Sequence, residues 1–334
     1  MKQPRFLGVT VFGYATILTA ALIILNHAYL ISTHQGLSAW ILYGLTATIP
    51  LGAATFFSPR IPGSNQVTRI GFTWLLASFI LSGFTFLSSL VQIPVVTAWA
   101  PTTLLVALGY TQASTAKIEK NERKWSGDTK KRVVQITDVH LGDVWDETTM
   151  KDIVNRVAGL KPDIVVVTGD LIDGMDDEAI HAVKHLEQLD PPVVFVPGNH
   201  DGYGDQKQLI KTLQDIGVHV LQDQTQEIAG IHVHGVDYQT PWKSTLQNIH
   251  EPDLILKHEP RVNIQDTQSP ILCGHVHAGQ IWPFHLLARL DFPYTKGTYQ
   301  ENNGFLHINS GTRTWGPPIR LGTRSEIFVL DLIP

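Results

Sequence analysis

The stretch Val193-Val194-Phe195-Val196-Pro197-Gly198-Asn199-His200-Asp201 decides the fold of this chain. Four large apolar residues in succession predict a strand buried on both faces of a sheet. The run stops at a Pro-Gly pair, where the glycine permits a sharp turn and a close backbone approach. An amide, an imidazole and a carboxylate follow at once. Alone, such a cluster is typical of a polar turn, but four other stretches of this chain end in the same way.

Two apolar stretches upstream also end in polar side chains. A strand expected over 133–137 runs into Asp138 and His140, and a strand over 164–168 runs into Asp170. Helical patterns separate and follow these strands at 147–158, 178–189 and 206–216. Strand-helix alternation predicts right-handed parallel crossovers, and such sheets bind ligands beyond the carboxyl ends of their strands. The polar clusters are therefore expected at one edge of a sheet.

Two later strands, expected at 254–256 and 271–273, are followed by His258 and by the pair His275 and His277. The potential ligands then number seven: Asp138, His140, Asp170, Asn199, His258, His275 and His277. Seven donors exceed one tetrahedral ion and suit two ions that share a bridging carboxylate. Their oxygen and nitrogen chemistry, without thiolate, indicates a hydrolytic site. His232 and His234 are left out, because their alternation inside a strand is typical of the exposed face of an edge strand.

In this order, the five motifs resemble the signature of the calcineurin-like metallophosphoesterases. The ending of the chain resembles that of the membrane-bound branch, the transmembrane proteins with a metallophosphoesterase domain, at Ser310-Gly311-Thr312, at 315–321 and at Glu326-Ile327. The resemblance implies an α/β fold, a four-layer αββα sandwich. It also implies hydrolysis of a phosphate ester, a phosphodiester rather than a monoester, by a hydroxide that bridges two divalent ions of manganese, iron or zinc.

The resemblance also implies a role for each matching residue. The first metal is assigned to Asp138, His140 and His277, the second to Asn199, His258 and His275, and Asp170 bridges both. His200 matches the catalytic histidine of the family. Asp201 matches its acidic neighbour, expected to raise the pKa of the histidine or to orient its ring.

The two parts of the chain differ in composition. Residues 1–116 contain no Asp or Glu and only four Lys or Arg, so the overall charge of −5 divides into +4 and −9. Four apolar segments, 6–31, 37–57, 71–90 and 94–113, are long enough to span a bilayer. We therefore expect an all-α transmembrane anchor of about four helices over 1–116. A basic linker over 117–132, with a first short strand as an alternative within it, and the metallophosphoesterase domain over 133–334 are expected to follow.

The cations predict the orientation of this anchor. They lie before the first segment, between the second and third, and after the fourth, so the positive-inside rule places both termini in the cytoplasm. The catalytic domain is then expected at the cytoplasmic face of the cell membrane. Transport is a weaker reading, because His27 alone is ionisable within the apolar segments.

The substrate is less defined. Five aromatic residues, Trp282, Phe284, Phe292, Tyr294 and Trp315, either pack in the core or line a groove for an acyl chain. The groove would favour a lipid-linked substrate, which makes a lipid-linked nucleotide pyrophosphatase or a phospholipid hydrolase the alternative enzyme. A catalytically silent membrane scaffold or transporter is the alternative from another class. No nucleic-acid partner is predicted, and the single cysteine, Cys273, excludes an internal disulfide.

Overall fold

The computed structural model describes residues 99–173, 177–203, 205–246 and 252–334, with four isolated helical positions between 73 and 84. The chain divides into two compact units, 1–108 and 109–334. The first three apolar segments of the sequence fall outside the described residues, except for those four positions. The fourth overlaps helix α5 (Trp99–Ser114). None of the helices in the described part of the chain has the length and apolarity of a membrane span.

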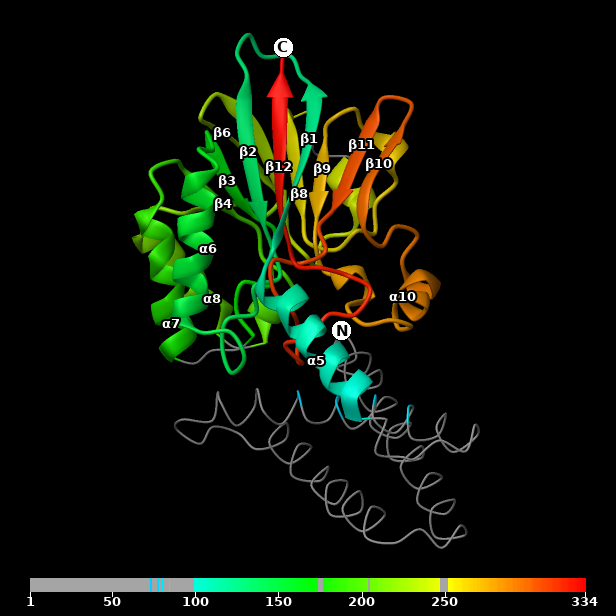
Figure 1. The fold of residues 1–334 in the computed structure, drawn as a ribbon. Coiled ribbons are helices and arrows are strands. Elements are labelled where there is room, and N and C mark those ends of the chain that lie inside the picture. The colour runs from blue at the N-terminus through cyan, green and yellow to red at the C-terminus, as the bar shows by residue number, and fades with distance from the viewer. Residues whose placement is uncertain are drawn as a thin grey trace, which may run out of the picture. The chain divides into compact units, whose positions relative to one another are not determined.

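The second unit contains two six-stranded sheets (Figure 1). In the first sheet the order is β1 (Lys117–Lys124), β12 (Glu326–Ile333), β2 (Lys131–Ile136), β3 (Ile164–Val167), β4 (Val193–Phe195) and β5 (His219–Val220). Strands β2 to β5 are parallel to one another, as the strand-helix alternation predicts. Strand β12 pairs antiparallel with β2 and parallel with β1.

The second sheet is also largely parallel. Its order is β10 (Gly297–Glu301), β11 (Gly304–Ile308), β9 (Ile271–Cys273), β8 (Leu254–Lys257), β7 (Ile231–Val236) and β6 (Gln224–Ile228). The four inner strands run parallel, and hairpin partners close both edges. The carboxyl ends of β8 and β9 therefore lie at one edge of this sheet.

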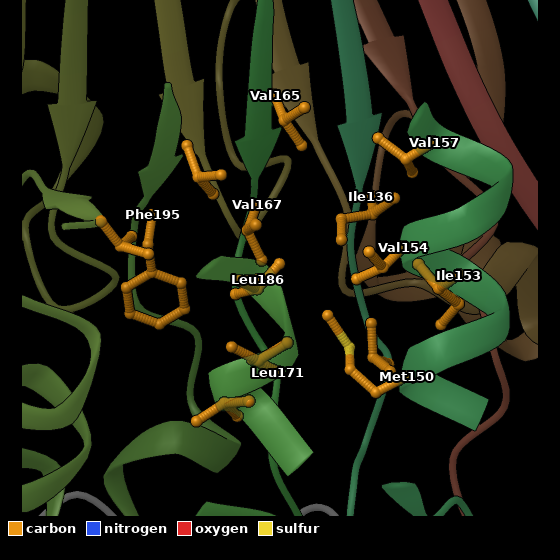
Figure 2. Packing of buried hydrophobic residues seen from close by; sticks show 14 of the residues in the cluster. Ile136, Met150, Ile153, Val154, Val157, Val165, Val167, Leu171, Leu186 and Phe195 are labelled. Carbon is orange, nitrogen blue, oxygen red and sulfur yellow. The ribbon is translucent and has the colours of Figure 1, made fainter. Parts of the chain in front are cut away.

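Helices cover the outer face of the first sheet: α6 (Glu147–Gly159), α7 (Asp177–Val183) with the 3₁₀ turn η2 (Lys184–Gln188), and α8 (Gln206–Asp215). In α6 the buried residues Met150, Ile153, Val154 and Val157 recur at helical spacing and form one apolar face. Figure 2 shows this face against Ile136 and Val167 of the sheet. Burying each such side chain is worth about 1.5–3 kcal/mol, which holds the helix on the sheet.

Alternate residues of the same strands pack on opposite sides. Val165 and Val167 belong to the cluster under the helices, whereas Ile164 and Val166 belong to the cluster between the two sheets. This division follows from the two-residue period of a strand, and it explains why these strands are apolar throughout. The predicted α/β two-sheet fold is confirmed.

Short segments cover the outer face of the second sheet. They are α9 (Trp242–Leu246), η4 (Ile264–Asp266) and α10 (His285–Asp291), and a third apolar cluster lies beneath them. This helical layer is thinner than the one on the first sheet.

The basic region 117–132 contains a strand, the alternative that the sequence left open for it. Residues 117–124 form β1, which pairs along its full length with β12. Its burial alternates between exposed and half-buried positions, so few apolar residues mark it in the sequence. The basic character of this segment reflects a solvated edge strand.

Candidate metal centre

The residues predicted to bind metal follow five different strands. Asp138 and His140 follow β2, Asp170 follows β3, Asn199 follows β4, His258 follows β8, and His275 and His277 follow β9. The buried Gln135 of β2 donates to the Cys273 carbonyl of β9 over 3.0 Å, which ties the two sheets together directly beneath these ends. The structure thus brings the carboxyl ends of both sheets to one place.

The backbone at these positions is unusual. Five of the seven side chains belong to non-glycine residues with positive φ: Asp138, His140, Asp170, His275 and His277, with values between 49° and 74°. Such a conformation costs about 1–3 kcal/mol per residue and clusters at functional sites, where the surrounding structure enforces it.

Three of the side chains form a first group. Nε2 of His277 lies 3.3 Å from Oδ1 of Asp138 and 3.0 Å from Nε2 of His140. Two ring nitrogens at this distance, beside a buried carboxylate, bring several lone pairs close together. One cation could bind all three side chains at this point.

A second group lies beside the first. Oδ1 of Asn199 is 3.2 Å from Nε2 of His258 and 3.0 Å from Nδ1 of His275. The two ring nitrogens are 3.2 Å apart. Burial, followed by the positive charge of His258, lowers the pKa of His275 to about 3, so its ring is neutral, the form that binds metal.

Asp170 lies between the two groups. Its Oδ2 is 3.1 Å from Nε2 of His258 and 3.9 Å from Nε2 of His140. Burial opposes a charge on His258, but the carboxylate of Asp170 outweighs it and raises the pKa of His258 to about 10. The site therefore attracts positive charge at the point where a second ion would lie. Six of the seven predicted donors belong to three overlapping groups, one of which also includes His200, and within each group the ligand atoms lie within 4.8 Å of one another. With Oδ1 of Asn199 beside His258 and His275, these oxygen and nitrogen donors fit a pair of divalent ions.

Two further contacts fix the ring orientations. Nδ1 of His258 donates to the Thr168 carbonyl over 2.8 Å, and Nδ1 of His140 lies 3.0 Å from Oδ1 of Asp173. Each contact engages Nδ1 and leaves Nε2 facing the site, the usual arrangement of a metal-binding histidine.

Glycines allow the loops to approach this closely. A Cβ on Gly198 would lie 2.2 Å from Oδ1 of Asp170, and one on Gly274 would lie 2.3 Å from Oδ2 of Asp138. Both carboxylates are buried and have no room to retreat. Any side chain at either glycine would displace a predicted ligand.

His200 lies at the rim of the same site. Its ring packs edge-on against His140, with ring centroids 4.7 Å apart, and its backbone N–H donates to Oδ1 of Asp170 over 2.8 Å. Nδ1 of His200 is 2.6 Å from Oδ1 of Asp173. Burial opposes a charge on this ring, but Asp170 and then Asp173 outweigh it and raise the pKa of His200 to about 9.

The expectation that Asp201 orients His200 is wrong. Both oxygens of Asp201 accept backbone N–H groups: Oδ2 from Asp170 and Gly198, and Oδ1 from Leu171 and Ile172, over 2.8–3.2 Å. The 3₁₀ turn η3 (His200–Gly202) directs this carboxylate into the protein, where it joins the loops after β3 and β4. Asp173 is the acidic partner of His200 instead, and the sequence analysis missed it.

Arg320 is a second residue to which the sequence assigned no role at the site. Its guanidinium is fully buried and donates to the His277 carbonyl over 2.9 Å and to the Arg313 carbonyl over 2.8 Å. The same tail donates from the Thr312 N–H to the Thr137 carbonyl over 2.8 Å. The tail therefore holds the loops of the first ligand group from behind, and only its resemblance to the membrane-bound branch signalled a role.

Comparison with known proteins agrees with this geometry. Residues 131–296 match the family model described as calcineurin-like phosphoesterase. An uncharacterized metallophosphoesterase of Helicobacter pylori is 28% identical over 225 residues, 62% of this chain and 61% of that protein. A transmembrane protein with metallophosphoesterase domain of Bos taurus is 32% identical over 233 residues, 60% of this chain and 52% of that protein.

The likeness to solved structures is weaker. A structure described as a novel archaeal phosphodiesterase covers 54% of this chain and 84% of its own at 13% identity, with a TM-score of 0.34.

Residues 131–296 therefore form a calcineurin-like metallophosphoesterase domain. Domains of this class are metal-dependent phosphoesterases. Relatives named as transmembrane proteins with this domain share about 30% of their residues with the chain over the matched region. The chain spans 61% of the length of the Helicobacter relative and 52% of the length of the bovine one.

Proposed function

We propose that this chain hydrolyses phosphate esters with the help of two divalent metal ions. Asp138, His140 and His277 would hold one ion, and Asn199, His258 and His275 the other, with Asp170 shared between them. The observation that carries the proposal is the position of the Asp170 carboxylate, within 4 Å of a histidine nitrogen from each group. When bound, such a pair of ions activates a water molecule and neutralises the phosphoryl oxygens.

The chain's own residues supply the proton. His200 lies beside the site with its pKa raised to about 9, so its ring carries a proton at neutral pH. We assign it the donation of that proton to the leaving oxygen of the ester. Asp173 is its positioning partner, because the carboxylate contacts both His200 and the predicted ligand His140.

A phosphodiester is the substrate class that we favour, and aromatic rings at the rim support it. Phe292 packs edge-on against His275 with ring centroids 5.3 Å apart, and Trp315 lies 5.6 Å from His200 by the same measure. These rings offer apolar contact to the second group of a diester, which a monoester lacks. Manganese, iron and zinc all suit the donors.

A lipid-linked ester is the second candidate. The acid-free, apolar residues 1–116 support attachment of the chain to a membrane, with the domain on the cytoplasmic side according to the distribution of cations. A lipid-linked nucleotide or a phospholipid would then lie within reach of the site. Analysis of the products distinguishes hydrolysis of a lipid-linked nucleotide from the other reactions, because a nucleotide pyrophosphatase releases a nucleoside monophosphate.

The full-length protein, purified in detergent and supplied with Mn²⁺, tests the proposal with the chromogenic diester bis(p-nitrophenyl) phosphate and its monoester. We expect hydrolysis of the diester above that of the monoester. Asn199→Ala should abolish it, whereas Asn303→Ala, at an exposed turn, should leave it unchanged. Equal activity of wild type and Asn199→Ala would contradict the proposal, and a silent scaffold would hydrolyse neither ester.

A further inference from the structure

Four large apolar side chains lie exposed next to one another in sequence around helix α10. Trp282, Leu286, Leu287 and Leu290 are 67%, 53%, 52% and 85% exposed, and we call them the α10 patch. Large exposed apolar patches on soluble domains mark surfaces that bind a protein or a membrane. The α10 patch is therefore expected to bind a protein or a membrane.

The opposite side of the helix is fixed to the domain. Ala288 and Phe292 pack on the apolar cluster of the second sheet, and the edge of Phe292 meets His275 of the metal centre. Gly279, which follows His277 closely, lies so near the first residue of α10 that a Cβ would be 2.2 Å from the His285 Cα. The patch is thus held in a fixed position beside the metal centre.

Cations lie beside the patch. A cavity of about 410 Å³ is lined in part by Lys117, Lys296 and Arg324. It shares the loop at Gly322 with the patch, since the Trp282 N–H donates to the Leu321 carbonyl over 2.8 Å. The cavity therefore opens next to the apolar surface.

The carboxylates of the cavity are already engaged. Glu326 lies 2.7 Å from Nε2 of His307, and Glu119 lies 2.7 Å from Nζ of Lys117. Within the described part of the chain, no carboxylate is paired with Lys296 or Arg324. These two cations remain available to an anion.

The chain enters the domain at the same end. Within the second unit, the Gly109 carbonyl accepts the Arg320 N–H over 2.9 Å, and the Ala113 carbonyl accepts the Ser325 hydroxyl over 2.7 Å. Residues 109–116 thus join the domain beside the loop that carries the patch and the cavity. The apolar, acid-free residues 1–98 precede this point. Figure 1 shows α10 and the start of β1 at the end of the sheets where the metal-binding loops lie.

From this arrangement we propose that the α10 patch and its cations form a docking surface for an anionic lipid bilayer. Trp282 and the leucines enter the interface between head groups and acyl chains, and Lys296 and Arg324 bind lipid phosphates. Docking would turn the metal centre toward the membrane surface. This consequence for the substrate rests on the proposed function, whereas the docking itself does not.

A fluorescent probe in the full-length chain tests the docking. Leu290→Cys is labelled with a polarity-sensitive dye and reconstituted with vesicles of phosphatidylcholine and phosphatidylglycerol. The native Cys273 is fully buried, and burial raises its pKa to about 12, so it does not compete for the dye. The matched control is Asp128→Cys, an exposed position beyond the far end of β1, a strand that extends about 23 Å from Lys117 to Lys124 at ~3.3 Å per residue.

We expect the emission of the Leu290 probe to shift to the blue and to be quenched by lipids brominated in their acyl chains. The Asp128 probe should show neither effect. Lys296→Gln and Arg324→Gln should each shift the docked-to-undocked ratio about fivefold toward the undocked state. Vesicles of phosphatidylcholine alone should give the same weakening.

A Leu290 probe that lipid quenchers do not reach would overturn the proposal. A blue shift that depends on protein concentration and not on brominated lipid would also overturn it, because a second copy of the chain would then cover the patch. These outcomes do not involve catalysis, so they remain separate from a failure of the proposed phosphodiesterase activity.

Discussion

At the scale of the residue, Asp173 links the predicted proton donor of the site to one of its predicted metal ligands. Its carboxylate contacts His140, a predicted ligand, and His200, the predicted proton donor. The family resemblance favoured Asp201 for this role, but the 3₁₀ turn at His200 directs Asp201 toward backbone N–H groups. Sequence spacing does not show which of two nearby carboxylates a tight turn will bury.

Replacing His200 separates proton donation from metal binding. In His200→Ala we expect turnover to fall by about 10²–10⁴, because general acid catalysis is lost. The metal content, measured by inductively coupled plasma mass spectrometry, should stay near that of the wild type. His181→Ala, at an exposed site on α7, serves as the control. An equal loss of metal in His200→Ala would identify His200 as a ligand.

The Asp201 carboxylate is expected to act on stability. Asp201→Asn replaces one acceptor oxygen with an amide NH₂ that faces backbone donors, so at least one buried N–H loses its partner. We expect a loss of about 1–3 kcal/mol in the free energy of unfolding, measured by thermal denaturation after metal removal. Asp215→Asn, at the exposed end of α8, should unfold like the wild type. An unchanged melting temperature for Asp201→Asn would contradict the role as a loop clamp.

At the scale of the element, the strands that carry the site could be predicted because they are buried on both faces. The predicted strands at 164–168, 254–256 and 271–273 agree with β3, β8 and β9 within one residue at each end. The sequence analysis did not find β6, β10, β11 and β12, because hairpins and a distant return strand leave no local alternation with helices. The reading of His232 and His234 as part of an edge strand was wrong, since β6 covers that edge.

The return strand β12 depends on an ion pair across β2. Asp331 accepts from Arg132 Nε and Nη2 over 2.7 and 3.0 Å, and Lys130 lies 2.8 Å away. The hydrogen bonds from Arg132 lower the pKa of Asp331 to about 2 from an ordinary 3.8. A lowered pKa in the folded state means that the stabilisation is present above pH 4 and is lost as the pH falls toward 2.

Asp331→Asn should therefore lose about 1 kcal/mol of stability at pH 7. The difference from the wild type should shrink as the pH falls through about 2, because Asp331 then takes up a proton and becomes neutral like the asparagine. Denaturant unfolding across this pH range checks it, with Asp190→Asn as an exposed control. A difference that is constant with pH would show that packing, and not the charge, stabilises β12.

At the scale of the whole molecule, the short motifs predicted the metal site, and the charge asymmetry predicted a membrane anchor. Five short motifs spread over about 140 residues placed seven side chains in one site, because parallel strands bring their carboxyl ends together. Strained turns, the partner of His200 and the buried Arg320 depend on contacts between distant loops, which local spacing does not encode. The charge asymmetry of the chain predicts a membrane anchor over 1–116, and most of that region lies outside the described residues.

The proposed metal centre requires that two metal ions share Asp170. Metal analysis of the full-length protein after equilibration with Mn²⁺ and gel filtration tests this directly, comparing wild type with Asp170→Asn and with Asp215→Asn as the control. We predict two ions per chain in the wild type and in the control, and loss of both in Asp170→Asn, because each group would lose the carboxylate that it shares. Two ions retained by Asp170→Asn, or none bound by the wild type, would contradict the account.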